Sequence, residues 1–451
     1  MSKEAPKKKI VLGEEGLFDA SQLGGGRMLV LGVQHLFAMF GATVLVPVLT
    51  GLSISSTLLF AGLGTLLFHI LARGKVPAFL GSSFVFLAGY WAIAPNKEPE
   101  LLPYACLGVA CAGALYLILA ALIRAFGAGK VMRFFPPIVT GPIIISIGLT
   151  LAYSAIDNCA TNWWIALIAI AVVIACNIWG KGMIKIVPIL LGVLVSYIVA
   201  AVTGNADFTA VKDAAWIGLP FKGSDTVFSI FGNPDTSLII SAIITIMPIA
   251  LATMVEHIGD MCAISSTTGK NHIADPGLHR TLLGDGLATI LASLFGAPAN
   301  TTYGENTGVL ALTKVYDPKV IRIAAYFAIL LSFCPKFAAL IAAMPAATIG
   351  GVSLVLYGMI SAVGVRNIVE NQVDFTKSRN VIIAALIMGL AIGIAFSAAG
   401  AISFTIGSVT ISLTSLAVAA VVGIILNAVL PGNDYVFKTE ETEQKYQTYK
   451  V

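Results

Sequence analysis

The stretch GAPANTTYGENTGV (296–309), together with KVPAFLGSSFVF (75–86), decides how this chain folds. Each stretch lies among apolar segments that are able to cross a bilayer, and each is interrupted by Gly, Pro, Ser, Thr or Asn. Hydrocarbon offers no water to backbone N–H and C=O groups, so irregular backbone survives there only where it lines a cavity or is buried in protein. Two such interruptions, one in each half of a chain, are typical of secondary transporters with a binding site near the membrane midplane.

The composition indicates that lipid is the solvent for much of the surface. Of the 451 residues, 57% are hydrophobic and 11% are charged, whereas about 25% are charged in ordinary soluble proteins. The net charge of +4 is small and the basic residues are dispersed, which argues against nucleic acid as a partner. The six cysteines lie mostly in apolar runs without CxxC spacing, so neither a disulfide framework nor a metal site is predicted.

Hydropathy, with breaks at Gly, Pro and charged residues, predicts an all-α polytopic membrane protein with fourteen membrane segments. Segments 3 and 10 contain the two interrupted stretches, and each is expected to be a short extended piece followed by a half-helix. The predicted segments are 28–50, 54–72, 77–94, 103–125, 137–156, 162–179, 184–202, 237–258, 281–296, 297–313, 320–343, 345–364, 378–398 and 408–430.

The distribution of Lys and Arg supports this count. With the N-terminus in the cytoplasm, all but four of the 27 basic residues fall on the cytoplasmic side of the predicted segments. A single missed segment would invert every later connection, so the bias favours fourteen segments with both termini in the cytoplasm. The protein is accordingly expected in the cell membrane. The four basic residues predicted outside are Lys97, Lys212, Lys222 and Lys336.

The fourteen segments divide into two sets of seven, and an odd number places the second set upside down relative to the first. This is a 7+7 inverted repeat, in which segments 3 and 10 occupy equivalent positions. The N-termini of their half-helices would point at a shared cavity. The remaining parts are an N-terminal tail (1–27), an extracellular loop (203–236) and a C-terminal tail (431–451).

Four acidic residues fall within or near the ends of predicted segments: Glu256 and Asp260 near the end of segment 8, Asp285 in segment 9 and Glu305 in segment 10. Ionisable groups inside a membrane are rare and usually functional. Glu256 and Asp260 share one helix face, and two close carboxylates in a low dielectric cannot both ionise cheaply. At least one is therefore expected to bind a proton, as proton coupling requires. The alternative is that segment 8 ends at His257 and Asp260 faces water.

Glu305 begins the second half-helix, where the positive end of the helix would stabilise its carboxylate. The alternative role is that of a helix cap, and both roles are compatible. Gly304 would let the backbone approach a ligand closely and donate its N–H to a ligand carbonyl. The aromatic residues beside the two interruptions, Phe84 and Tyr303, could sandwich a flat ligand, although a lone Phe in a membrane protein more often faces lipid or the core.

Other polar residues indicate structure rather than chemistry. His35 in segment 1 is expected to brace neighbouring helices, with a proton relay as the alternative, and His69 is also expected to be structural. The order Glu256-His257-x-x-Asp260 offers metal-ligating residue types, but adjacent helical residues point in different directions and no third ligand cluster follows. The full phosphate-loop pattern is absent. No metal, cofactor or enzymatic activity is therefore predicted.

Over nearly its whole length the chain resembles the nucleobase–ascorbate transporter family, and most closely its bacterial members that carry uracil. The stretch ENTGVLALTK (305–314) fits the family signature, an acid, amide or Pro followed by Asn-x-Gly-x-x-x-x-Thr and a basic residue or Gly. The resemblance extends to QHLFAMFGATVLVPVLTGL (34–52), KVPAFLGSSF (75–84), EHIGD (256–260), DPGLHR (275–280), NTTYGENTGVLALTKVY (300–316) and GGVSLVLYG (350–358).

The resemblance implies a core domain and a gate domain. The core would comprise segments 1–4 (28–125) and 8–11 (237–343), and the gate would comprise segments 5–7 (137–202) and 12–14 (345–430). It also implies a homodimer that imports uracil by proton symport as the core moves against the gate.

The resemblance further assigns roles by position. Glu256 and Glu305 would bind the base, and Phe84 and Gly304 would offer backbone N–H groups. The site is completed by two tyrosines: Tyr303, which would pack on the ring, and Tyr357, which would line the gate side of the cavity. Proton coupling would rest on the acids of this site, Glu256, Asp260 and Glu305.

One position departs from the pattern of the uracil-carrying members, which have His where this chain has Asp260. Purine-carrying relatives often have Asp there, but they usually carry Gln in place of Glu305. The mixture favours uracil, because Glu305 would contact the base while Asp260 would lie behind it. A xanthine, urate or other nucleobase carrier, sodium coupling, and an anion transporter or channel of the same fold stay open as alternatives.

Overall fold

The computed structural model describes residues 15–406, 409–433 and 435, and most of these are helical. Within them, seven helices are long and apolar enough to cross a membrane, or eight if the bent pair α15 (Pro318–Ser332) and α16 (Pro335–Ala342) is one span. The protein is therefore a multi-pass membrane protein. The count of fourteen segments stays a prediction, because several predicted segments contain helices too short to qualify by length alone. The outer parts of both predicted tails, 1–14 and 436–451, lie outside the described residues.

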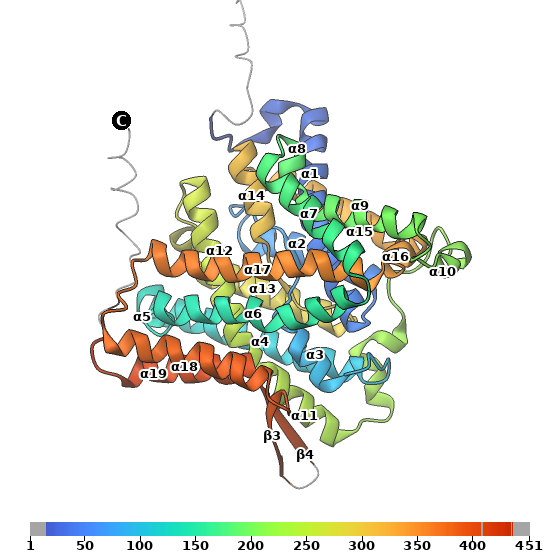
Figure 1. The fold of residues 1–451 in the computed structure, drawn as a ribbon. Helices are drawn as coiled ribbons and strands as arrows, with labels where there is room; N and C mark the ends of the chain where they lie inside the picture. The colour runs from blue at the N-terminus through green and yellow to red at the C-terminus, as the bar shows by residue number, and fades with distance from the viewer. Residues whose placement is uncertain (1–14, 407–408, 434, 436–451) are drawn as a thin grey trace, which may run out of the picture.

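The first half of the described chain is built from helices with one short strand (Figure 1). Its elements in order are η1 (Ala20–Leu23), α1 (Gly25–Thr50), α2 (Ile54–Leu71), β1 (Leu80–Ser82), α3 (Leu87–Ile93), α4 (Leu102–Phe126), α5 (Ala128–Met132), α6 (Pro137–Ala160), α7 (Trp163–Trp179), α8 (Met183–Ile186) and α9 (Pro188–Val202). The predicted extracellular loop contains three short helices, α10 (Thr209–Asp213), η2 (Gly223–Asp225) and η3 (Val227–Gly232).

The second half follows a similar order. Its elements are α11 (Thr236–Ile246), η4 (Met247–Ile249), α12 (Ala250–Thr268), η5 (Ile273–Gly277), α13 (Leu278–Leu294), β2 (Asn300–Thr302), α14 (Gly304–Thr313), α15, α16, α17 (Ala346–Glu370), α18 (Ser378–Ala395), β3 (Ala401–Ile406), β4 (Val409–Thr414) and α19 (Ser415–Val429).

Strands β1 and β2 come from the two interrupted stretches and pair with each other in antiparallel fashion, with Leu80 opposite Thr302. Neighbouring helices also satisfy the strand backbones. The N–H of Leu80 donates to Thr65 Oγ1 of α2 at 2.9 Å, and Thr289 Oγ1 of α13 donates to the carbonyl of Asn300 at 2.9 Å. Irregular backbone is thereby supplied with protein partners, as a water-free environment demands.

Glycines bring the backbones of packed helices into close approach. A Cβ on Gly148 of α6 would lie 2.1 Å from the carbonyl oxygen of Tyr357 on α17. A Cβ on Gly113 of α4 would lie 3.0 Å from the carbonyl oxygen of Gly286 on α13. Small residues at such crossings let membrane helices pack tightly without a hydrophobic driving force. The first crossing also determines where Tyr357 lies relative to α6.

Helix contacts recur when the two halves of the chain are exchanged. Helix α2 packs on α15 as α13 packs on α4, and α7 packs on α9 as α18 packs on α19. The packing of α6 on α18 likewise matches that of α17 on α7, and α6 and α17 lie side by side (Figure 1). An inverted repeat of seven segments predicts this reciprocal packing.

The hairpin β3–β4 corrects the expectation of an all-α fold. Residues 409–414, predicted as the start of the last membrane segment (408–430), form a strand that pairs with β3, and helix α19 begins only at Ser415. In Figure 1 this hairpin projects from the helices, next to α11. The prediction was wrong because hydropathy averages cannot distinguish a short β-branched strand from an apolar helix.

The N-terminal segment of the described chain is attached to the start of α15. The N–H of Leu17 donates to the carbonyl of Lys314 at 2.8 Å. The buried carboxylate of Asp317 accepts from the N–H of Ala20 at 2.8 Å and from the N–H of Lys319 at 2.9 Å. Asp317 therefore both caps α15 and holds the segment before α1.

Replacing Asp317 by Ala is expected to destabilise the protein by about 2–3 kcal/mol, because it removes a helix cap and leaves a buried N–H unpaired. The measurement is thermal unfolding of the purified protein in detergent. The matched control is Asp207→Ala, which removes only an exposed carboxylate that accepts from Thr209. Equal effects of the two substitutions would contradict the role of Asp317.

Candidate functional site

Helix α12 carries Glu256 and Asp260 on one face, and both residues are partly buried. The helix continues to Thr268, and Asp260 is partly buried rather than exposed. Asp260 Oδ2 accepts a hydrogen bond of 2.7 Å from Thr302 Oγ1, at the end of β2. This bond ties α12 directly to the strand that leads into α14.

Glu305 lies in the first turn of α14 and is partly buried. Its carboxylate is close enough to interact electrostatically with those of Glu256 and Asp260. Within the described part of the chain, Glu256 Oε2 is buried and has no hydrogen-bond partner. Buried polar atoms almost always have one, so an acceptor in this position indicates a place for a donor from outside the chain.

Gly304 is the first residue of α14, and the space beside it is open. A Cβ on Gly304 or on Gly308, one turn further along, would meet no heavy atom within 4 Å. Both glycines are exposed, and neither has the left-handed backbone that favours glycine. Backbone conformation and packing therefore do not require glycine here, whereas close approach of a ligand to the helix N-terminus would.

Tyr303 packs against the first strand. Its hydroxyl donates to the carbonyl of Ser82 at 2.8 Å and lies 3.4 Å from the hydroxyl of Thr43, which donates to it. Gly81 provides the room, since a Cβ there would lie 2.4 Å from the tyrosine ring. Tyr303 thus braces β1 against β2 and α1, a role that the sequence did not suggest.

Replacing Tyr303 by Phe is expected to lower the free energy of unfolding by about 1–2 kcal/mol, because the buried carbonyl of Ser82 loses its donor. The ring stays, so ligand affinity should change by less than about threefold, which corresponds to well under 1 kcal/mol. Thermal unfolding and ligand binding of the purified protein measure the two effects. Tyr326→Phe, at an exposed position on α15, is the matched control. Unchanged stability would contradict the bracing role.

Phe84 and Tyr357 are in contact although they are far apart in the sequence. Phe84 follows β1, Tyr357 lies on α17, and their ring centroids are 5.6 Å apart at an interplanar angle of 76°. Tyr357 is fully buried and Phe84 is 7% exposed. An edge-to-face pair of this kind is favourable beyond the area it buries. It joins the two sets of helices that the family resemblance assigns to core and gate.

A buried polar contact between α12 and α13 was missed by sequence reasoning. His257 Nδ1 and Asp285 Oδ2 are 3.0 Å apart and both side chains are fully buried. Asp285 was noted only as an acid inside a segment, because spacing along the chain cannot show which helices α12 and α13 bring together. The side chain of His35 has the expected bracing role, since its Nδ1 is within hydrogen-bond distance of Asn306 Nδ2, at 3.1 Å.

Comparison with known proteins identifies the family. A family model described as a permease family matches residues 26–400. The chain belongs to this family, the nucleobase–ascorbate transporters. The permease is 39% identical to the uracil permease of Bacillus caldolyticus, with 90% of this chain and 93% of that relative covered. It is 38% identical to the uracil permease of Escherichia coli (strain K12), with 88% and 90% covered. Its relatives are named permeases, so it is a transporter and not an enzyme.

Solved structures with low sequence identity share the fold of this permease. The transmembrane domain of a cyanobacterium bicarbonate transporter, BicA, has a TM-score of 0.61 at 15% identity, covering 92% of this chain and 99% of that one. The structure of SLC26A9 has a TM-score of 0.64 at 13% identity, covering 89% of this chain and 64% of that one. Both likenesses concern the fold alone.

Proposed function

We propose that this permease imports uracil by proton symport across the cell membrane. The observation that carries the proposal is that Glu256 and Glu305 lie close enough to interact electrostatically beside the open N-terminus of α14, and that one buried oxygen of Glu256 has no partner among the described residues. Uracil presents two N–H donors and two carbonyl acceptors around a flat ring. Carboxylates can accept from the donors, and a backbone N–H at a helix N-terminus can donate to a carbonyl. The similarity to uracil permeases supports the same substrate.

The remaining site residues have roles that fit this substrate. The backbone N–H groups of Phe84 and Gly304 would donate to the carbonyl oxygens of uracil, and Tyr303 would pack on the ring. Tyr357 would close the cavity from the gate side. Its contact with Phe84 supports a site at the boundary between the two sets of helices.

Transport would proceed by alternating access of a core domain (28–125 and 237–343) against a gate domain (137–202 and 345–430), related by the inverted repeat. The reciprocal helix contacts support the repeat. Lys212 and Lys336, two of the basic residues predicted outside, lie together because Lys336 Nζ donates to the Lys212 carbonyl at 3.2 Å. This contact supports the prediction that both residues lie on the same side of the membrane. The homodimer is proposed from the family resemblance alone.

The test of the substrate is equilibrium binding of a panel of free bases to the purified protein across a range of pH. Uracil should bind more tightly than xanthine and urate, because Glu305 accepts where purine carriers of the family usually have Gln. If xanthine or urate binds more tightly than uracil, the substrate is a purine and not uracil.

Proton coupling predicts that an outside-acidic gradient raises initial uracil uptake severalfold in sealed, sodium-free vesicles. Asp260→Asn should abolish this stimulation while binding persists, because Asn cannot release a proton but its carbonyl still accepts from Thr302. If wild-type uptake is equal with and without the proton gradient, proton symport is excluded. Uptake that depends on sodium instead would assign the coupling to that ion.

Anion transport is the second candidate function, because the solved structures with this fold are named a bicarbonate transporter and an anion transporter. The site favours it less. Helices α3 and α14 contain no Lys or Arg, and α14 places Glu305 at its N-terminus, where an anion would be repelled. Saturable inhibition of uracil uptake by bicarbonate or chloride would favour this alternative.

A further inference from the structure

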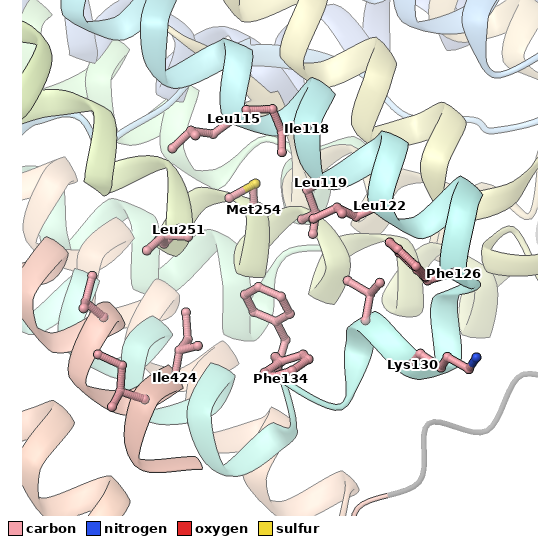
Figure 2. A pocket seen from close by; sticks show the side chains of 14 residues that line it. Leu115, Ile118, Leu119, Leu122, Phe126, Lys130, Phe134, Leu251, Met254 and Ile424 are labelled. Carbon is pink, nitrogen blue, oxygen red and sulfur yellow. The ribbon is translucent and has the colours of Figure 1, made fainter. Parts of the chain in front are cut away.

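The described chain has an apolar groove of about 590 Å³ on the side of α4 that faces away from α13. Its walls come from α4, the α5 region, α12 and α19 (Figure 2). This volume falls within the range of about 300–1,000 Å³ that is usual for small-molecule sites. The groove is separate from the carboxylates described above, because it is lined by Leu251 and Met254 of α12 and not by Glu256 or Asp260.

The longest wall of the groove is a stripe on α4. Leu115, Ile118, Leu122 and Phe126 follow one another along one face of the helix toward Lys130, as Figure 2 shows. At 1.5 Å per residue this stripe is about 16 Å long. Ile118 and Phe126 are 55% and 59% exposed. Such a long, open and apolar channel suits an extended hydrocarbon chain better than a polar solute.

One end of the groove is basic. Among the described residues, Lys130 is the only charged one that lines the groove, and it lies near Phe126 (Figure 2). The connection that contains Lys130, residues 124–133, also carries the exposed Arg124 and Arg133 and has no acidic residue. A hydrocarbon channel with a basic residue at one end, in a connection that carries two further basic residues, matches the two parts of an anionic phospholipid.

We propose that this groove binds one anionic phospholipid, with an acyl chain along the α4 stripe and the phosphate at Lys130. The apolar walls account for the chain, and the charge at Lys130 selects an anionic headgroup over a zwitterionic one. Lipids that contact the rest of the apolar surface would show no such preference for an anionic headgroup.

The position of the groove gives the lipid a role in transport, a step that rests on the proposed function. Helices α4 and α12 belong to the proposed core, and Ile424 and Ile425 of α19 belong to the proposed gate. The space available to an acyl chain between these helices would change as the core moves against the gate. Bound lipid should therefore favour the arrangement described here and change the uptake rate.

Binding is tested without uracil or any gradient, so its result is independent of the proposed function. The purified protein is incubated with an equal mixture of phosphatidylglycerol and phosphatidylcholine, and retained lipids are counted by native mass spectrometry. The variants are Lys130→Gln and Leu122→Trp, the second of which fills the groove. The matched controls are Lys185→Gln and Leu167→Trp, at exposed positions outside it.

The wild-type protein and both controls should retain one phosphatidylglycerol in preference to phosphatidylcholine. Lys130→Gln should reduce that preference about fivefold, and Leu122→Trp should remove the retained lipid. Equal retention of the two lipids by the wild type would overturn the proposal. Full retention by Leu122→Trp would also overturn it, since the lipid would then lie elsewhere. If Leu122→Trp does not purify as a folded protein, the lipid preference of Lys130→Gln alone tests the proposal. An unchanged preference for phosphatidylglycerol in that variant would overturn it.

Discussion

Replacing Glu256 by Gln is expected to lower uracil affinity by about ten- to a hundredfold. Hydrogen bonds to charged groups contribute about 1.5–3 kcal/mol, and each 1.4 kcal/mol is tenfold in affinity. Gln would keep the size of the side chain but would supply a weaker acceptor and add N–H groups that face the donors of the base. The measurement is titration of the purified protein with uracil at constant pH.

Two controls separate the loss of binding from a loss of fold. Glu370→Gln makes the same change at an exposed site on α17, where the acid pairs with Arg366, and should leave affinity unchanged. Thermal unfolding of the ligand-free Glu256→Gln protein should show no loss of stability, because the buried Glu256 Oε2 makes no hydrogen bond within the described residues. Wild-type affinity in the variant would exclude Glu256 from the site.

Replacing Glu305 by Gln is expected to lower uracil affinity by about tenfold and to raise the affinity for xanthine relative to uracil. The loss follows from removing a charged acceptor at the N-terminus of α14. The change in selectivity follows from chemistry, because the amide of Gln both donates and accepts and so suits a purine edge that presents both kinds of group. Purine-carrying relatives usually have Gln at this position.

The experiment compares uracil and xanthine on the same preparations of wild type, Glu305→Gln and the Glu370→Gln control. A selectivity ratio that stays at the wild-type value, with uracil affinity retained, would refute the assignment of Glu305 to the base. An equal loss of both ligands would assign Glu305 to the integrity of α14 rather than to selectivity, and thermal unfolding would then show a matching loss of stability.

The acids of the candidate site were singled out in the sequence because the membrane restricts what can be buried. Glu305 and Glu256 stand out since ionisable groups are costly in hydrocarbon, and helical spacing alone places Asp260 on the same face as Glu256. The resemblance to the nucleobase–ascorbate transporter family is confirmed by the family match. The assigned role of each residue stays a prediction that the substitutions above test.

Several features could not be predicted because they depend on contacts between distant segments. The pair of His257 with Asp285 joins two helices, and the room that Gly81 leaves for Tyr303 joins two strands. The β3–β4 hairpin was missed for a local reason, since its residues are as apolar on average as a helix. The groove beside Lys130 has no sequence signal, because its walls come from four separate parts of the chain.

The amino-acid sequence by itself determined that this is a multi-pass membrane protein, where its apolar helices are interrupted, and which acids lie within them. Those properties are local, because the cost of exposing a peptide group or a charge to lipid is incurred residue by residue. Only the tertiary structure decided that α12 and α14 pack together so that their carboxylates interact, that Phe84 touches Tyr357, and that α4, α12 and α19 enclose a groove. Those properties are set by how helices from the two halves pack, which no single stretch of sequence specifies.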